Sequence, residues 1–258
     1  MIIKKSPAEI EAMKEAGRIS AKVLRLVGAA VEPGISTKEL DALAERLFKA
    51  EGAKPGFKGY GGFPGSICAS VNNEIVHGIP SKKKILKEGD IISIDTGALL
   101  DGWYGDNAWT YPVGKVTPDV QMLLDVTEQS MWNGLAAAQA GGHLGDIGAA
   151  VERLANKHHL GVVRELVGHG IGRDMHEEPS VPNYGLKHFG RKIEVGMCLA
   201  IEPMFNLGSR KIVYWDDGWL ITTRDGTWSA HFEKSVAVTE EGTIILTTET
   251  DYERPVSG

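Results

Sequence analysis

The chain has 258 residues, 42% of them hydrophobic and 24% charged, which is the composition of a globular protein with a sizeable core. Its net charge of −6 and pI of about 5.8 argue against a nucleic-acid-binding surface. Cys68 and Cys198 form neither a CxxC pair nor a disulfide framework, and no segment resembles a signal peptide or a membrane span, so we expect a cytoplasmic protein with no membrane or nucleic-acid partner.

The first segment is predicted to form two helices separated by a break. Ser6-Pro7-Ala8-Glu9 indicates a helix start, with a serine cap, a proline in the first turn and a glutamate that completes a capping box. Apolar residues at helical spacing follow: Ile10, Met13, Val23 and Val27. The break is "EPGIS" at 32–36, and the second helix is expected to face inward with Leu40, Leu43 and Leu47. The basic run "SKKKILK" at 81–87 is interpreted as a solvated loop, with a transient ribosome contact as the alternative.

Two strand-like runs surround Asp101-Gly102, a strong hairpin signal. A two-residue loop would place Asp95 opposite Ala108 and Asp106 opposite Gly97. The two aspartates would then lie on one face of the sheet as diagonal neighbours, about 7–8 Å apart at the backbone, and their carboxylates would reach a common ion.

The second half of the chain follows the pattern of the first. Thr117-Pro118 opens a helix, "GG" at 141–142 breaks it, and "IGAAVERLANKHH" continues as another. Arg46 precedes Asp95 by 49 residues, and Arg153 precedes Glu202 by the same interval. We therefore predict one domain over 1–258, built from pseudo-repeats at approximately 6–114 and 117–247.

Further on, "VGHGIGRDMHEEP" at 167–179 combines two histidines, His169 and His176, with three glycines. We interpret "VGHGIG" as a short strand whose glycines let His169 approach an ion closely. Glu202 follows the apolar strand "GMCLAIE", and Glu233 lies within the strand-like run "SAHFEKSVAV".

Four converging carboxylates would repel one another and raise one another's pKa, whereas two divalent cations and a bridging hydroxide would neutralise them. Oxygen ligands with one imidazole suit Mn, Fe, Co or Zn. Two such ions, about 3.5–4 Å apart, activate water and clamp a tetrahedral intermediate. The residues alone thus predict a dinuclear metallohydrolase.

The chain resembles the methionine aminopeptidases of the short bacterial type (type I, in the first subfamily of peptidase family M24), which have the duplicated α/β pita-bread fold. The resemblance covers nearly the whole chain and is carried by "NNEIVHGIP" (72–80), "SIDTGALLDGWYGDNAWTY" (93–111), "GHGIGRDMHEEP" (168–179), "IEPM" (201–204) and "FEKSVAVT" (232–239).

The resemblance implies two divalent metal ions per chain, with Co, Mn, Fe, Zn and Ni all open. It implies Asp95 on the first ion, His169 and Glu202 on the second, and Asp106 and Glu233 bridging both. His77 and His176 would contact substrate, and Glu202 would transfer the proton during attack by the metal-bridging hydroxide. The implied substrate is a peptide or nascent chain that begins with methionine followed by a small residue.

A methionine pocket is also implied by the resemblance, and a mixture of aromatic and sulfur-containing side chains suits a thioether. Its residues are Phe57, Tyr60, Phe63, Cys68, Met175 and Trp219. Met175 stands where many relatives carry an aromatic residue, and Phe57 where some carry cysteine. The family also suggests a monovalent cation near Asn72, Glu74 and Ser229.

Two alternatives share these features. A proline-specific aminopeptidase uses the same five ligands but usually carries an extra N-terminal domain, whereas only helix-forming sequence precedes residue 55 here. A metal-free pita-bread binding module would have lost ligands that are all present in this chain. We expect a monomer.

Overall fold

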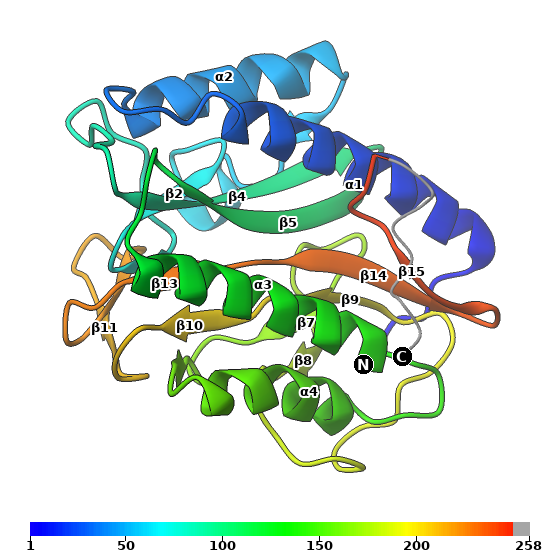
Figure 1. Cartoon of the computed structure of the whole chain (residues 1–258). Coiled ribbons are helices and arrows are strands. Elements are labelled where there is room, and N and C mark those ends of the chain that lie inside the picture. Colours follow the sequence, from blue (N-terminus) through cyan, green and yellow to red (C-terminus); the bar gives the residue numbers. More distant parts are fainter. Residues whose placement is uncertain (250–258) are drawn as a thin grey trace.

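Two pairs of helices lie on the outside of the molecule, and the sheets lie between them (Figure 1). The computed structural model describes residues 1–249. The helices in this part of the chain are α1 (Pro7–Gly28), α2 (Thr37–Ala50), α3 (Pro118–Ala137) and α4 (Leu144–Lys157), with a short 3₁₀ turn, η1 (Tyr60–Gly62). None of the helices in residues 1–249 is long and apolar enough to cross a membrane.

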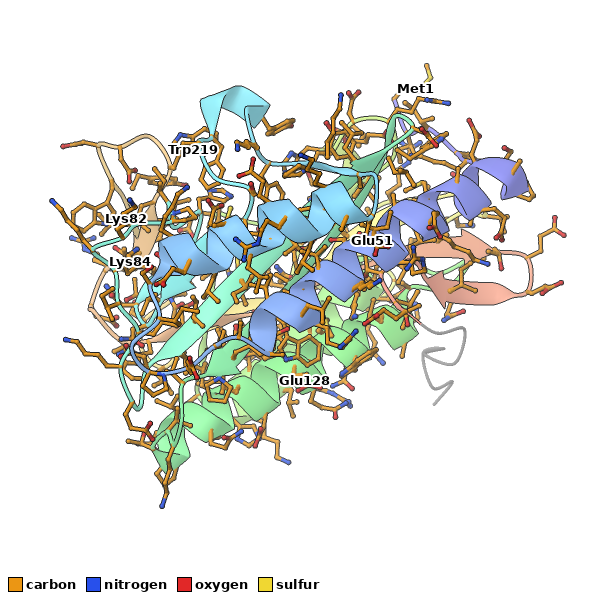
Figure 2. The ribbon with its side chains drawn as sticks, turned by 90° about the horizontal axis from the view of Figure 1, so that it is seen from above. Met1, Glu51, Lys82, Lys84, Glu128 and Trp219 are labelled. Atoms are coloured by element: carbon orange, nitrogen blue, oxygen red, sulfur yellow. The ribbon has the colours of Figure 1, made fainter. Side chains whose placement is uncertain are left out.

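The first helix pair begins as the sequence predicts. Ser6 caps α1 and exchanges hydrogen bonds with Glu9, and Ser36 caps α2 in the same way with Glu39. Salt bridges from Arg18 and Lys22 of α1 reach Glu51 at the end of α2, at 3.2 and 2.6 Å, and connect the two helices. Figure 2 labels Glu51 at this end of α2.

The predicted inner face of α1 is confirmed, since all four of its predicted residues are buried. That of α2 is only partly correct, because Leu43 and Leu47 are half-buried whereas Leu40, Ala44 and Phe48 are fully buried.

The first sheet contains the hairpin that carries the two aspartates. Its strands are β1 (Lys54–Pro55), β2 (Cys68–Val71), β4 (Ile91–Leu100) and β5 (Trp103–Pro112). The pairing of Asp95 with Ala108 and of Gly97 with Asp106 confirms the predicted register, and no bulge interrupts β4 and β5. Asp101 and Gly102 have φ values of 49° and 81°, as a two-residue turn between twisted strands requires.

The second large sheet has the strand order β15-β14-β9-β7-β8. Its strands are β7 (Gly168–Gly170), β8 (Glu177–Val181), β9 (Cys198–Ile201), β14 (Lys234–Thr239) and β15 (Gly242–Ile245). Glu202 directly follows β9, as predicted. Helices α3 and α4 pack together, and α3 contacts β9 and β14.

Two three-stranded sheets complete the described part of the chain. One has the order β13-β10-β6, with β6 (Gly161–Val162), β10 (Met204–Asn206) and β13 (Ser229–His231). The other has the order β11-β12-β3, with β3 (Glu74–Val76), β11 (Ile212–Tyr214) and β12 (Ile221–Thr223).

The prediction that Glu233 lies within a strand is wrong in detail. The chain leaves one sheet at His231 and joins another at Lys234, and Glu233 lies in the break between β13 and β14. There its N–H donates to the carbonyl of Ala108 at 2.9 Å. This contact with β5 satisfies the backbone at the break and joins the two halves of the chain beside Asp106.

Candidate metal centre and substrate pocket

Every residue that the sequence assigns to the metal centre lines one cavity of about 200 Å³. These residues are Asp95, Asp106, His169, Glu202 and Glu233. They come from β4, β5, β7, the end of β9 and the break before β14, so both halves of the chain supply them. Two clusters have ligand atoms within 4.8 Å of one another and share Glu233: one adds Asp106 and His169, and the other adds Glu202 and His231.

The acidic oxygens of this cavity fit a divalent cation. One oxygen each of Asp95, Asp106 and Glu233 is buried and has no hydrogen-bond partner in the described structure. Buried polar atoms are almost always paired, so such a concentration indicates a cation that these oxygens would bind.

Electrostatics support the same conclusion. Burial raises the pKa of Asp106 to about 7. Burial, and then the neighbouring carboxylates, hold the pKa values of Asp95, Glu202 and Glu233 well above their usual range. The protein thus assembles acids that it does not itself neutralise, and bound divalent cations would restore their charged form.

His169 is oriented to act as a ligand. Its Nδ1 lies 2.9 Å from the carbonyl oxygen of Gly170, which can only accept a hydrogen bond, so Nδ1 carries the proton. Nε2 therefore presents a lone pair, at 3.4 Å from Glu202 Oε1 and 4.0 Å from Asp106 Oδ2. Burial lowers the pKa of His169 to about 4, which keeps the ring neutral and able to coordinate a metal at neutral pH.

His176 lies beside His169 but has different partners. The two ring centroids are 4.3 Å apart, yet His176 belongs to neither ligand cluster around Glu233. Its Nδ1 lies 2.9 Å from the Tyr60 hydroxyl. When that hydroxyl donates to Nδ1, Nε2 carries the proton and is available as a neutral donor. Burial lowers the pKa of His176, which favours this neutral form.

His77 lines the same cavity from the chain after β3. Its backbone is left-handed, with φ of 60°, and its ring stands edge-on to Trp219 with centroids 6.3 Å apart. Burial, and then the proximity of His176, lowers the pKa of His77, so both rings are neutral at the cavity wall.

The residues of the predicted methionine pocket also line the cavity: Phe57, Tyr60, Phe63, Cys68, Met175 and Trp219. Phe57, Phe63, Cys68 and Met175 form a buried apolar cluster against which Trp219 packs. Figure 2 shows Trp219 at one end of the molecule, beyond α2. A Cβ added to Gly97 would lie 3.0 Å from Phe57 and 3.1 Å from Met175. The glycine therefore allows both side chains to pack directly against the backbone of β4.

Asn72, Glu74 and Ser229 lie outside the cavity lining, and their side chains already have partners. The Asn72 amide bonds Asp90 and the N–H of Ile91, and Glu74 pairs with Lys84 at 2.6 Å. The Ser229 hydroxyl donates to the carbonyl of Phe205 at 3.2 Å. A monovalent cation at this place stays a prediction.

Five residues that line the cavity escaped the sequence analysis: Val76, Leu166, Val167, Met204 and His231. His231 lines the cavity and belongs to the second cluster with Glu202 and Glu233. The signal was present, because residues two apart in an extended segment point to the same side, and His231 precedes Glu233 by two.

The cavity holds carboxylates without neutralising partners, an imidazole nitrogen with a free lone pair, and an adjoining apolar pocket. This combination defines a metal-dependent hydrolase. Comparison with known proteins shows the family to which the chain belongs. Residues 11–240 match the model of metallopeptidase family M24, and the chain belongs to that family.

Two similar proteins are both methionine aminopeptidases. The chain is 52% identical over 247 residues to methionine aminopeptidase 1 of Bacillus subtilis (strain 168), covering 96% of this chain and 99% of that protein. Its structure matches that of the methionine aminopeptidase from Thermotoga maritima with a TM-score of 0.95 and 43% identity, covering 96% and 100% of the two chains.

A proline-specific relative matches less closely. The X-Pro aminopeptidase from Thermotoga maritima MSB8 has a TM-score of 0.74 at 22% identity, and the match covers 97% of this chain but only 64% of that one. This likeness shows the shared pita-bread fold and no more.

Proposed function

We propose that this chain is a metalloaminopeptidase that removes the N-terminal methionine from nascent proteins and peptides whose second residue is small. The relatives that match it over nearly their full length are methionine aminopeptidases, and neither alternative is favoured. The observation that supports the assignment most strongly is the single cavity, in which unpaired buried carboxylate oxygens adjoin a pocket of aromatic and sulfur-containing side chains.

The proposed ligands are Asp95, Asp106, His169, Glu202 and Glu233. Two divalent ions bound there would supply Lewis-acid activation of water and of the scissile carbonyl, and an anchor for the free amine of the substrate. Fe, Co, Zn, Mn and Ni are all compatible with four carboxylates and an imidazole.

Glu202 is placed to move the proton. Its Oε1 lies 3.4 Å from His169 Nε2, and its backbone carbonyl accepts a hydrogen bond from Asn183 Nδ2 at 3.0 Å, which fixes the segment after β9. In the proposed reaction Glu202, in its charged form, accepts a proton from the attacking water and delivers it to the leaving amine.

His176 and His77 complete the substrate site. With Tyr60 bonded to Nδ1, the Nε2–H of His176 can donate to the oxygen that becomes negative when the carbonyl is attacked. His77, buried beside Trp219, would contact the substrate backbone from the other wall.

Specificity follows from the pocket and the confined cavity. Met175 and Cys68 give a methionine thioether polarisable neighbours, and Phe63 packs edge-on against Trp219 with ring centroids 5.1 Å apart. A cavity of about 200 Å³ leaves little space for a large second side chain.

The direct test is methionine release from Met-Ala-Ser by purified protein supplied with Mn or Co. Stripping the metal with a chelator should abolish release, and adding it back should restore release. Faster hydrolysis of Ala-Pro-Ser than of Met-Ala-Ser would instead support the proline-specific alternative.

A further inference from the structure

His231 is a buried side chain whose ring nitrogen is unpaired. It is the last residue of β13, only 2% of its surface is exposed, and it lines the cavity of the metal centre. Its Nε2 has no hydrogen-bond partner in residues 1–249. A buried imidazole nitrogen left unpaired is costly, so its position requires an explanation.

The backbone at His231 is held in place from the other half of the chain. The Thr110 hydroxyl on β5 accepts a hydrogen bond from the His231 N–H at 2.9 Å and donates to the His231 carbonyl at 2.7 Å. Met204 of β10 pairs with the same residue. These contacts fix the backbone of His231 beside the cavity that its side chain lines.

The ring faces the two carboxylates that the proposed metal centre uses. Nε2 lies 3.7 Å from Glu202 Oε2 and 3.9 Å from Glu233 Oε2. These separations are too long for hydrogen bonds. Two ligand atoms that bind one ion at about 2.0–2.2 Å lie roughly 3–4.2 Å apart, and both distances fall in that range.

Glu202 has an imidazole at each oxygen. His169 Nε2 approaches Oε1 at 3.4 Å, and His231 Nε2 approaches Oε2 at 3.7 Å. The two ligand clusters thus have the same composition, one imidazole and two carboxylates, and they share Glu233. The spacing of ligand atoms around His231 Nε2 therefore resembles the spacing around His169 Nε2.

We propose that His231 Nε2 is a sixth protein ligand of the metal centre and binds an ion together with Glu202 and Glu233. The inference rests on the metal centre of the proposed function and extends it. A second imidazole shifts the preference of the site toward Fe, Co, Ni and Zn and away from Mn, which favours oxygen ligands.

Two variants separate a ligand from a hydrogen-bond donor. His231→Gln keeps a donor of similar reach without a ring nitrogen, and His231→Leu removes both functions. His77→Gln is the matched control, because His77 lines the same cavity but lies outside both ligand clusters. Calorimetric titration of metal-free protein should show Co affinity at one site falling about 100-fold in both His231 variants. Loss of a residue that merely hydrogen-bonds a ligand costs up to about that factor, and loss of a direct ligand should cost at least as much. The His77 variant should match wild type, and Mn affinity should fall less than Co affinity.

X-ray absorption of the Co-loaded wild type provides a readout that needs no variant. The inference predicts imidazole scattering from two rings per pair of ions, whereas His169 alone would give one. A single ring, or a His231→Gln protein with Co affinity within about 3-fold of wild type, would overturn the assignment of His231 and leave the metal centre intact. A wild-type protein that binds no divalent metal would overturn the proposed centre itself.

Discussion

A buried ion pair between Lys5 and Glu177 stabilises the loop that carries His176. Lys5 Nζ bonds Glu177 Oε2, and the two side chains are only 2% and 5% exposed. Glu177 Oε1 also accepts the backbone N–H groups of Arg173 and Asp174, at 2.9 and 3.3 Å. Glu177 therefore fixes both the turn before His176 and the start of β8.

We predict that Lys5→Met destabilises the protein by about 3–5 kcal/mol, because it leaves the Glu177 charge buried without its partner. The cost should lie near the lower end, since two backbone donors still solvate that carboxylate. Glu177→Met should cost more, because it leaves those two N–H donors without an acceptor and, within residues 1–249, leaves Lys5 Nζ with only the carbonyl of Ile3, at 3.0 Å. A loss of 3–5 kcal/mol corresponds to a fall in Tm of roughly 6–20 °C for a chain of this size.

Urea unfolding of metal-free protein measures these changes without the contribution of the metal. Lys4→Met is the control, since Lys4 and Glu194 form a surface pair with side chains 51% and 42% exposed. It should change the free energy of unfolding by less than about 1 kcal/mol. If Lys5→Met and Lys4→Met unfold at the same urea concentration, the argument from burial is wrong.

Three further predictions concern the site. Metal at 100 times its dissociation constant should stabilise the protein by about 2.7 kcal/mol in thermal melts. The raised pKa of Asp106, about 7, means that the folded apo protein holds a proton that the unfolded chain releases, so apo stability should fall as pH rises from 5 to 8. At a fixed metal concentration the gain from metal should widen over the same range, because binding no longer has to displace that proton. His176→Ala should keep metal affinity in calorimetric titrations but lose about 10²–10³ in kcat; His169→Ala should instead bind metal weakly and recover part of its activity in excess metal. If the two variants lost metal affinity equally, the assignment of His169 as a ligand and His176 as a substrate contact would be wrong. Tyr60→Phe removes the 2.9 Å contact to His176 Nδ1 and should lower kcat while leaving metal content unchanged, so an unaltered kcat would count against this orientation of the ring.

Local signals determined what the sequence could predict. The Asp101-Gly102 turn sets the register of β4 and β5, so the relation of Asp95 to Asp106 followed from the sequence and is confirmed. The capping box at Ser6 likewise located the start of α1, whereas the equivalent box at Ser36 was not recognised in the sequence.

Features that depend on contacts between distant segments were missed. Nothing local indicates that Thr110 holds His231 or that Lys5 meets Glu177, 172 residues later. The break at Glu233 arises because β13 and β14 pair with different strands, β10 and β9, which periodicity does not show. The buried stripe of α2 follows Leu40, Ala44 and Phe48, at steps of four residues, so leucine positions alone misplaced its centre. The pseudo-repeat division at residue 117 stays a prediction.

The central claim is that a free N-terminal methionine is bound at a metal centre and released from a small second residue. One measurement tests it: initial rates of methionine release from Met-Ala-Ser, N-acetyl-Met-Ala-Ser and Met-Lys-Ser, with metal content determined on the same protein sample. The proposed function predicts rapid release from Met-Ala-Ser in proportion to bound metal, and little or none from the acetylated or lysine-containing peptide. Equal cleavage of free and acetylated Met-Ala-Ser, or full activity in protein shown to contain no metal, would contradict it.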